Sequence, residues 1–233
     1  AAPVFDRVAS RARSDPWHAL PEPMVETHAY PTGACFVENP GWLSGGAVRW
    51  ATRLVGLADD AAFDAAAATA PPGAGGLTFV PALAGAMTPV WRPEARGTLH
   101  GLTAGHDRGH VARAVLEGLA FACRDVAERL VALGLPLRDV LLLGGGARSA
   151  VWSQIRADAL GLPHRIAAAV ESCPIGAAMI AAVAAGIHAD LASAAACTAP
   201  PMATYEPGSP GVRDALDEAY RRYQAVSRVL LPG

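Results

Sequence analysis

An unbroken apolar run, Val140 to Leu143, leads directly into three consecutive glycines and then into a segment with helical apolar spacing. Such a run predicts a strand buried on both faces, as in a parallel sheet. Glycines between a strand and a helix let a ligand approach the backbone closely, and the helix N-terminus offers unpaired amides and partial positive charge. We expect here either a nucleotide-binding loop or a tight turn that needs glycine only for its backbone conformation.

Apolar residues spaced by three and four also predict a long helix over 110–133 and a closing helix over 212–230. Residues 1–40 are rich in proline and are expected to be irregular, because proline breaks helices and confines strands to short or edge positions. The order of strands and helices predicts an α/β fold with a largely parallel sheet. The remaining expected elements are helices over 44–55, 58–70, 149–160 and 175–185, strands over 77–80, 140–143 and 164–168, and loop regions over 84–109 and 199–211.

Composition excludes several classes of protein. The formal net charge of −2 argues against a nucleic-acid-binding surface, and no window of about 18 apolar residues predicts a membrane span. All 19 basic residues are arginine, which excludes a P-loop lysine, a Schiff-base lysine and the strand lysine of protein kinases. Phosphate, if it is bound, must therefore be bound by backbone amides or by arginine.

The cysteines and histidines do not predict a metal site. The four cysteines lie far apart without a CxxC pair, which favours reduced, mostly packed thiols in a cytoplasmic protein; they are Cys35, Cys123, Cys173 and Cys197. His106 and His110 are four residues apart but have no evident third ligand, so capping or packing is the expected role. Glu117 is expected on the surface of the long helix.

A second glycine-rich helix start occurs at Ser44-Gly45-Gly46, with Arg49 one turn further on. Arg49 is a candidate contact for a phosphate or a ribose, and pairing with a surface carboxylate is the alternative. Two such helix starts suit a nucleotide held between two halves of one domain. Neither has the GxGxxG spacing of dinucleotide-binding proteins, so a dehydrogenase is a weak interpretation.

Polar residues of the helix over 149–160 are expected to be structural. These residues are Gln154 and Asp158, and Asp158 is predicted to face solvent or to pair with Arg156 or Arg165.

The segment from Gly97 to Glu117 resembles in full the second signature of the FGGY carbohydrate kinases. It has a small residue, an apolar residue and Gly-Leu, then a seven-residue gap and His110, and it ends on Ala-Val-Leu-Glu. Further blocks of the chain are similar to the family in the same order, with xylulokinase as the most similar branch; they lie at 76–81, 88–97, 144–158, 176–186 and 220–223. The resemblance extends over about 28–230, after an irregular lead-in at 1–27, so 28–233 is the expected domain.

The resemblance implies an actin-like (ribonuclease-H-like) ATPase domain with a mixed, mostly parallel sheet flanked by helices. It implies the C-terminal, ATP-binding domain of a sugar kinase that uses MgATP and a sugar such as the ketopentose xylulose. Gly144, Gly145, Gly146 and Ser149 would line the adenosine pocket, and Gly45 with Arg49 would approach the adenine-ribose or phosphate side. His110 and Glu117 would shape the cleft wall. No catalytic residue and no metal ligand is assigned.

The family's general base is an Asp in a Gly-Asp motif, followed by a Gly-Thr-Ser-type phosphate loop. Neither occurs in these 233 residues, so both are expected upstream, on an N-terminal kinase domain. The isolated chain is then expected to be inactive and to self-associate as a homo-oligomer through Trp42, Trp50 and Trp91. A stand-alone, non-catalytic nucleotide-binding or interaction module is the alternative function.

Overall fold

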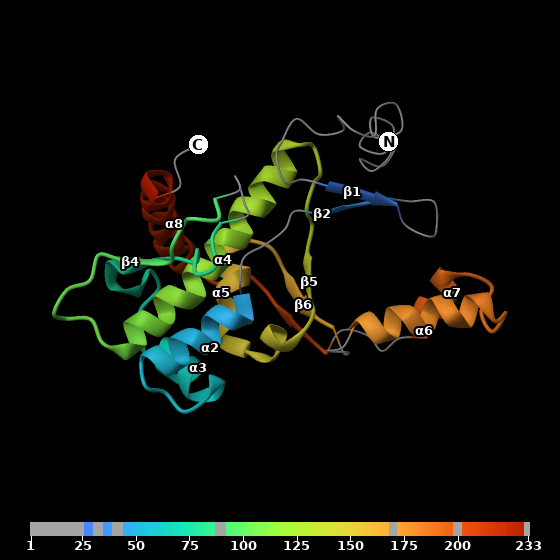
Figure 1. Ribbon diagram of the computed structural model, residues 1–233, viewed down its shortest axis with the longest axis horizontal. Helices are drawn as coiled ribbons and strands as arrows, with labels where there is room; N and C mark the ends of the chain where they lie inside the picture. The colour runs from blue at the N-terminus through green and yellow to red at the C-terminus, as the bar shows by residue number, and fades with distance from the viewer. Residues whose placement is uncertain are drawn as a thin grey trace.

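The computed structural model describes residues 26–29, 35–38, 44–86, 92–167, 172–197 and 202–230. Helices surround a central long helix (Figure 1). The helices are α2 (Ser44–Leu54), α3 (Asp60–Thr69), α4 (Arg108–Ala132), α5 (Ala150–Leu160), α6 (Ser172–Ala184), α7 (Leu191–Ala196) and α8 (Pro210–Leu230), with short 3-10 turns η1 (Ala74–Gly76) and η2 (Gly145–Arg148). The strands are β1 (Glu26–Ala29), β2 (Cys35–Glu38), β3 (Thr78–Val80), β4 (Thr98–His100), β5 (Val140–Leu142), β6 (His164–Ile166) and β7 (Ala203–Tyr205).

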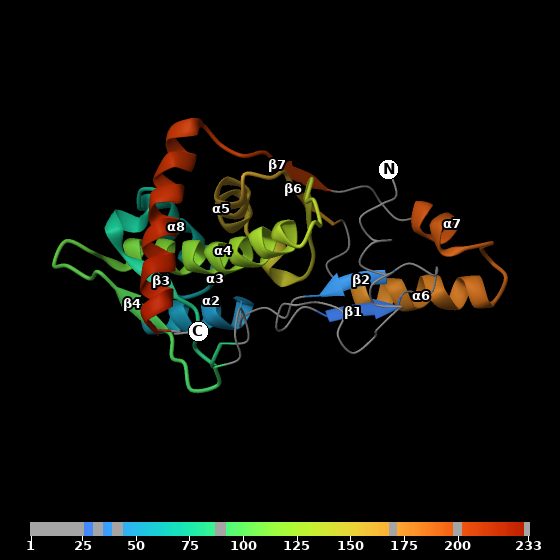
Figure 2. The same cartoon turned by 90° about the horizontal axis from the view of Figure 1, so that it is seen from above.

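Helix α4 forms the centre of the core, and it corresponds to the long helix predicted over 110–133. Helices α2, α3, α5 and α8 and strand β3 all pack against it, and α8 crosses it when seen from above (Figure 2). The helix starts with a capping box, in which Asp107 Oδ1 accepts from the backbone nitrogens of Gly109 at 2.9 Å and His110 at 3.1 Å. The backbone nitrogen of Asp107 donates in turn to His110 Nδ1 at 3.4 Å, so the predicted capping role of His110 is confirmed.

The approach of α3 and β3 to α4 depends on two glycines of that helix. A Cβ on Gly109 would lie 2.8 Å from the carbonyl oxygen of Ala66, and one on Gly118 would overlap the carbonyl oxygen of Phe79. Side chains from α3, α4, α5, α8 and β3 fill the core around α4. The largest fully buried ones are Tyr223, Phe63, Phe79, Leu116, Ile155 and Leu216.

The described strands form one mixed sheet and two antiparallel pairs, which confirms the α/β class, although the pairing is not mostly parallel as expected. Strands β5 and β6 pair in parallel with Val140 opposite His164, and β6 pairs antiparallel with β7. Strands β3 and β4 form an antiparallel pair, as do β1 and β2. Among the described strands, parallel pairing is thus confined to β5 and β6.

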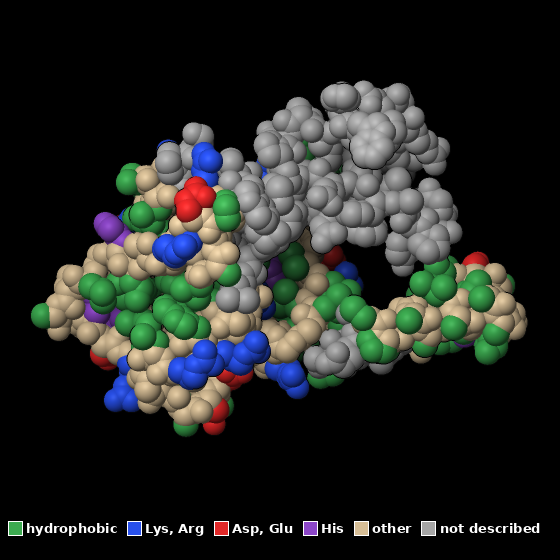
Figure 3. All heavy atoms as spheres, in the orientation of Figure 1, with side chains coloured by type: hydrophobic (Ala, Val, Ile, Leu, Met, Phe, Trp, Pro, Cys, Tyr) green, Lys and Arg blue, Asp and Glu red, His purple; other side chains and the backbone are tan. Residues whose placement is uncertain are grey.

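The prediction of a strand buried on both faces at 140–143 is wrong. Leu141 is 48% exposed and Leu143 is 50% exposed, because β5 is the edge strand of its sheet in the described residues and one of its faces is uncovered. Helices α6 and α7 form an arm that lies apart from the body (Figure 1), and Figure 3 shows hydrophobic side chains spread over its surface. Ile180 on this α6–α7 arm is 51% exposed.

Short elements were missed where the sequence predicted irregular chain. Strands β1 and β2 form a hairpin inside 1–40, β4 lies inside the predicted loop, β7 lies inside the predicted spacer, and α7 was not predicted at all. Elements of three to six residues carry too few apolar repeats to be recognised. In the described part of the chain, no helix is long and apolar enough to cross a membrane.

The expected packing of the cysteines is wrong for the three whose burial is described: Cys123, Cys173 and Cys197 are free thiols with exposed positions. Trp50 is half-buried and stacks on Phe79 with 6.1 Å between ring centroids. Trp42 and Trp91 lie outside the described residues.

Candidate functional site

A cavity of about 640 Å³ lies where the glycine loop after β5 meets the starts of α2 and α5 and one side of α3. This volume is in the range of small-ligand sites. The six residues that the sequence assigned to cofactor binding all line this cavity: Gly45, Arg49, Gly144, Gly145, Gly146 and Ser149. The other lining residues are Ser44, Val48, Asp60, Ala61, Asp64, Leu143, Arg148, Trp152 and Arg156.

The glycine loop owes its shape to local sterics. Gly144 has φ +78°, a backbone conformation that favours glycine. A Cβ on Gly146 would lie 2.8 Å from the Trp152 ring, so glycine is required for this ring to pack under the loop. Ser149 then caps α5 by accepting a hydrogen bond from the backbone nitrogen of Trp152 at 3.0 Å. The loop and the capped helix start form one wall of the cavity.

Three arginines reach the cavity, and none of them forms an ion pair with a carboxylate among the described residues. Arg49 and Arg148 are exposed. Arg156 is 9% exposed, with its Cζ atom 3.5 Å from the centroid of the Trp152 ring, and its Nη1 donates to the carbonyl oxygen of Gly146 at 3.4 Å. Burial lowers the pKa of Arg156 to about 10, so the guanidinium stays protonated at neutral pH.

Two carboxylates of α3 face the same cavity. Asp64 is half-buried and lines the cavity together with Ser149. Burial raises the pKa of Asp64, the polar Ser149 side chain opposes this shift, and the nearby charge of Asp60 adds to it. Three arginines against two aspartates leave the lining positive, which favours an anionic ligand.

Glu117 is not on the helix surface, so that prediction is wrong. Its carboxylate is 2% exposed and accepts from the backbone nitrogen of Gly73 at 2.9 Å and from Arg113 Nε at 2.6 Å. Burial raises the pKa of Glu117, and the charge of Arg113 opposes this. Glu117 does not line the cavity; it holds the turn before β3 against α4.

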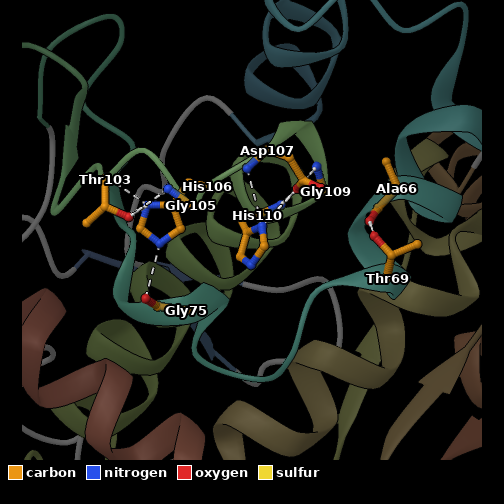
Figure 4. A network of polar contacts seen from close by, with 9 residues as sticks. All are labelled: Ala66, Thr69, Gly75, Thr103, Gly105, His106, Asp107, Gly109 and His110. Carbon is orange, nitrogen blue, oxygen red and sulfur yellow. Dashed lines mark hydrogen bonds and ion pairs between the residues drawn. The ribbon is translucent and has the colours of Figure 1, made fainter.

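The histidines lie in a separate network near the start of α4 (Figure 4). His106 Nε2 donates to the carbonyl oxygen of Gly75 at 3.1 Å, and its Nδ1 accepts from the backbone nitrogen of Thr103 at 3.0 Å. The centroids of the His106 and His110 rings are 5.2 Å apart. Within the described ranges, no group of three or more His, Cys, Asp or Glu side chains is arranged to hold a metal ion.

Asp158 is structural, as predicted, but it neither faces solvent nor pairs with Arg156 or Arg165. Asp158 is 8% exposed, and its Oδ1 accepts from Gln154 Nε2 at 2.7 Å and from the backbone nitrogen of Gly208 at 2.7 Å. Arg165 pairs instead with Asp139 at 2.8 Å. Asp158 therefore ties α5 to the segment before α8, and Gln154 supports it as expected.

Sequence reasoning did not assign four of the charged residues that line the cavity: Asp60, Asp64, Arg148 and Arg156. A signal was available in the spacing, because Asp60 and Asp64 are four residues apart on one helix and Trp152 and Arg156 are four apart on another.

A mixed sheet with flanking helices and a cavity beyond the strand–glycine turn agree with an actin-like, ribonuclease-H-like ATPase fold, which is the fold of the solved kinases that superimpose on this chain. A family model described as "FGGY family of carbohydrate kinases, C-terminal domain" matches residues 16–185. The chain therefore belongs to the FGGY family of carbohydrate kinases and corresponds to its C-terminal domain.

Solved structures agree with this assignment. The xylulose kinase of Rhodospirillum rubrum superimposes with a TM-score of 0.75 and 30% identity, over 92% of this chain and 43% of that one. The ligand-bound xylulose kinase of Lactobacillus acidophilus gives a TM-score of 0.77 and 25% identity, over 90% of this chain and 43% of that one.

Curated relatives include glycerol kinases. That of Citrifermentans bemidjiense is 39% identical over 152 residues, which are 65% of this chain and 31% of the relative. That of Halorhodospira halophila is 35% identical over 193 residues, 82% of this chain and 37% of the relative. The chain thus spans about a third of the length of the curated relatives it matches.

Proposed function

We propose that this chain is the nucleotide-binding part of an ATP-dependent kinase that phosphorylates a hydroxyl group of a small polyol or ketose. The observation that carries the proposal is the glycine-walled cavity with three arginines that have no carboxylate partner in the described structure. Such a cavity has a positive lining and the free amides of a helix N-terminus, and both favour phosphate. The residues at 144–146, with Gly45 and Ser149, provide close approach to the backbone.

Phosphoryl transfer requires mainly positioning and charge neutralisation. Arg49 and Arg148, at the open side of the cavity, are the proposed contacts for the phosphates, whereas Arg156 lies deeper against Trp152. Mg²⁺ would arrive with the nucleotide and would neutralise phosphate charge. No residue of the chain is proposed as a metal ligand or as the general base that takes the hydroxyl proton.

The proposed acceptor is xylulose, by the resemblance of the sequence, with glycerol as the second candidate because relatives named glycerol kinase match this chain. The general base and most sugar contacts are proposed to come from an N-terminal kinase domain, and the site of action to be the cytoplasm. The second candidate is a stand-alone nucleotide-binding module without catalysis, because the cavity offers contacts for a nucleotide but includes no residue that we propose as a general base.

Calorimetric titration of the 233-residue chain with MgATP, with NAD as the control ligand, tests the proposal. MgATP should bind and NAD should not. Gly146→Ala should weaken binding about ten-fold or more, because its Cβ displaces Trp152 and disturbs hydrogen bonds to the loop. Gly176→Ala on α6 is the matched control, since a Cβ there meets no atom within 4 Å. Binding of NAD in preference to MgATP would refute the proposal.

Phosphoryl transfer to xylulose and glycerol, measured with and without a kinase N-terminal domain added in trans, separates the two candidate functions. Transfer that requires the added domain supports the kinase. Nucleotide binding without transfer in either condition supports the non-catalytic module.

A further inference from the structure

The Arg156 guanidinium is a buried cation whose hydrogen-bond donors are mostly unused within the described residues. Arg156 is 9% exposed, and its Cζ atom lies 3.5 Å from the centroid of the Trp152 ring. Of its five N–H donors, one on Nη1 reaches the carbonyl oxygen of Gly146 at 3.4 Å, and no described carboxylate pairs with it. Because a buried charge is costly without a partner, the other donors favour a ligand that accepts hydrogen bonds.

The glycine at position 146 keeps this guanidinium open to the cavity. Gly146 and Arg156 both line the cavity, and a Cβ on Gly146 would lie 3.5 Å from Arg156 Nη2. A residue with a side chain at this position would therefore cover part of that nitrogen. The buried ring of Trp152 covers one face of the guanidinium. The N–H edge of Arg156 is thus the part that a ligand can reach.

The three arginines of the cavity differ in burial, and this difference orients a bound nucleotide. Arg49 and Arg148 are exposed and are the proposed phosphate contacts, whereas Arg156 is buried. Phosphates carry several negative charges and lose more hydration on burial than a neutral base does. A nucleotide that keeps its phosphates at the open side therefore directs its base toward Arg156.

The hydrogen-bonding groups of a purine decide how well it fits this edge. A guanidinium is a planar fork that only donates hydrogen bonds. Guanine offers two neighbouring acceptors, O6 and N7, and arginine contacts both of them at once, whereas adenine offers N7 beside a 6-amino group that donates. Hypoxanthine, the base of inosine, has the same O6 and N7 acceptors as guanine. Adenine therefore satisfies one donor of the fork and opposes the other.

We infer that Arg156 recognises a 6-oxopurine base, so that the cavity binds guanosine or inosine triphosphate more tightly than ATP. This inference rests on the proposed nucleotide-binding function and names the base that the cavity prefers. Arg156 is then a specificity-determining residue. ATP still binds, because its phosphates and N7 remain available to the same arginines.

The test compares MgATP, MgGTP and MgITP by calorimetry with the 233-residue chain. MgITP is the decisive ligand, because its base has an oxygen where adenine has the 6-amino group. It should bind about 10- to 100-fold more tightly than MgATP, the range expected for a bidentate contact between arginine and a purine. Arg156→Met should reduce this preference to within a few-fold. Arg156→Lys keeps the positive charge without the fork, so it should lose the preference as well.

Arg138→Met is the matched control. It makes the same chemical change at an exposed residue outside the cavity lining and should keep the preference for MgITP. Arg148→Met should weaken the binding of all three nucleotides by a similar factor, because their phosphates are identical. Thermal unfolding verifies that each variant is folded.

Equal or weaker binding of MgITP and MgGTP relative to MgATP by the unmodified chain would overturn the inference while leaving nucleotide binding intact. A preference for MgITP that survives in both Arg156 variants would also overturn it, by assigning base recognition to another residue. If Arg156→Met weakens all three nucleotides equally and keeps the preference, Arg156 contacts phosphate and the inference fails. Failure of every nucleotide to bind would instead refute the proposed function itself.

Discussion

The carboxylate of Glu117 accepts a hydrogen bond from the backbone nitrogen of Gly73, 44 residues earlier in the chain, at 2.9 Å. Gly73 has φ +83° and lies just before η1, the turn that leads into β3. Arg113, one turn before Glu117 on α4, donates to the same carboxylate oxygen at 2.6 Å. A buried charge is tolerated here because both its electrostatic partner and a backbone donor are in place.

Removal of this carboxylate should therefore destabilise the fold. We expect Glu117→Ala to lower the free energy of unfolding by about 3–5 kcal/mol, because Arg113 is left buried without its counter-charge. Glu117→Gln keeps an acceptor for Gly73 and should lose less. Urea denaturation measures both, with Glu218→Gln as the control: its surface pair with Arg222 should contribute no more than about 1 kcal/mol. A loss in Glu117→Ala no larger than in this control would contradict the interpretation.

His164 should make stability depend on pH near neutrality. It is 1% exposed in β6, with Nδ1 donating to the carbonyl oxygen of Leu162 at 2.8 Å. Burial lowers the pKa of His164 below its ordinary value of 6.5, and the charge of Arg156 lowers it further. The unfolded chain then binds the proton more readily than the folded chain, so this contribution is present above pH 6.5 and is lost as the pH falls toward the lowered pKa.

Urea denaturation between pH 5 and pH 8 measures this effect. The difference in unfolding free energy between the unmodified chain and His164→Gln should grow as the pH rises through about 6.5. His188→Gln, which removes a histidine from the turn after α6, is the matched control. A difference between the His164 variant and the unmodified chain that stays constant with pH would refute a lowered pKa.

The sequence allowed prediction of those elements whose signal is local. Helices α4 and α8 carry many apolar repeats, and the glycines at 144–146 mark the turn between β5 and α5. The burial of Glu117 could not be predicted, because its partner Gly73 is distant in sequence and an acidic residue within a helix normally marks the solvent side. The exposure of Leu143 was missed for a related reason: an apolar run does not reveal which sheet edge or face is left uncovered.

The candidate site was predictable only in its backbone part. Glycine patterns and the family resemblance placed Gly45, Arg49, the glycines at 144–146 and Ser149 together, and the structure brings them to one cavity. Asp64 was missed because α3 is an alanine-rich helix with weak periodicity. The spacing of Asp60 and Asp64 places both on one face of the helix, but it does not show that this face meets a cavity. Arg156 was considered only as one possible partner of Asp158, because a buried arginine without a carboxylate partner is a tertiary feature that spacing alone does not reveal.

Arg156 is expected to contribute to binding at the expense of stability. Its buried guanidinium has no carboxylate partner in the described structure, so Arg156→Met should raise the free energy of unfolding by up to about 1–2 kcal/mol while weakening MgATP binding about ten-fold. Arg113→Met is the matched control, because it breaks the pair with Glu117 and should lower stability. Thermal unfolding and calorimetry on each variant measure the two effects, and a loss of stability in Arg156→Met would contradict the assignment.

Self-association of the isolated chain should depend on the uncovered apolar surface of β5 and the α6–α7 arm. Leu141 is 48% exposed and Ile180 is 51% exposed, and surfaces of this kind are buried when they find a partner. We expect oligomers in sedimentation experiments, and Leu141→Glu combined with Ile180→Glu should shift the chain to monomer. Val229→Glu, at an 80% exposed position near the end of α8, is the control and should leave the oligomers unchanged. If the unmodified chain is a monodisperse monomer at high concentration, the prediction is contradicted. Such a result would mean that the apolar edge strand and the arm remain exposed to water without a partner.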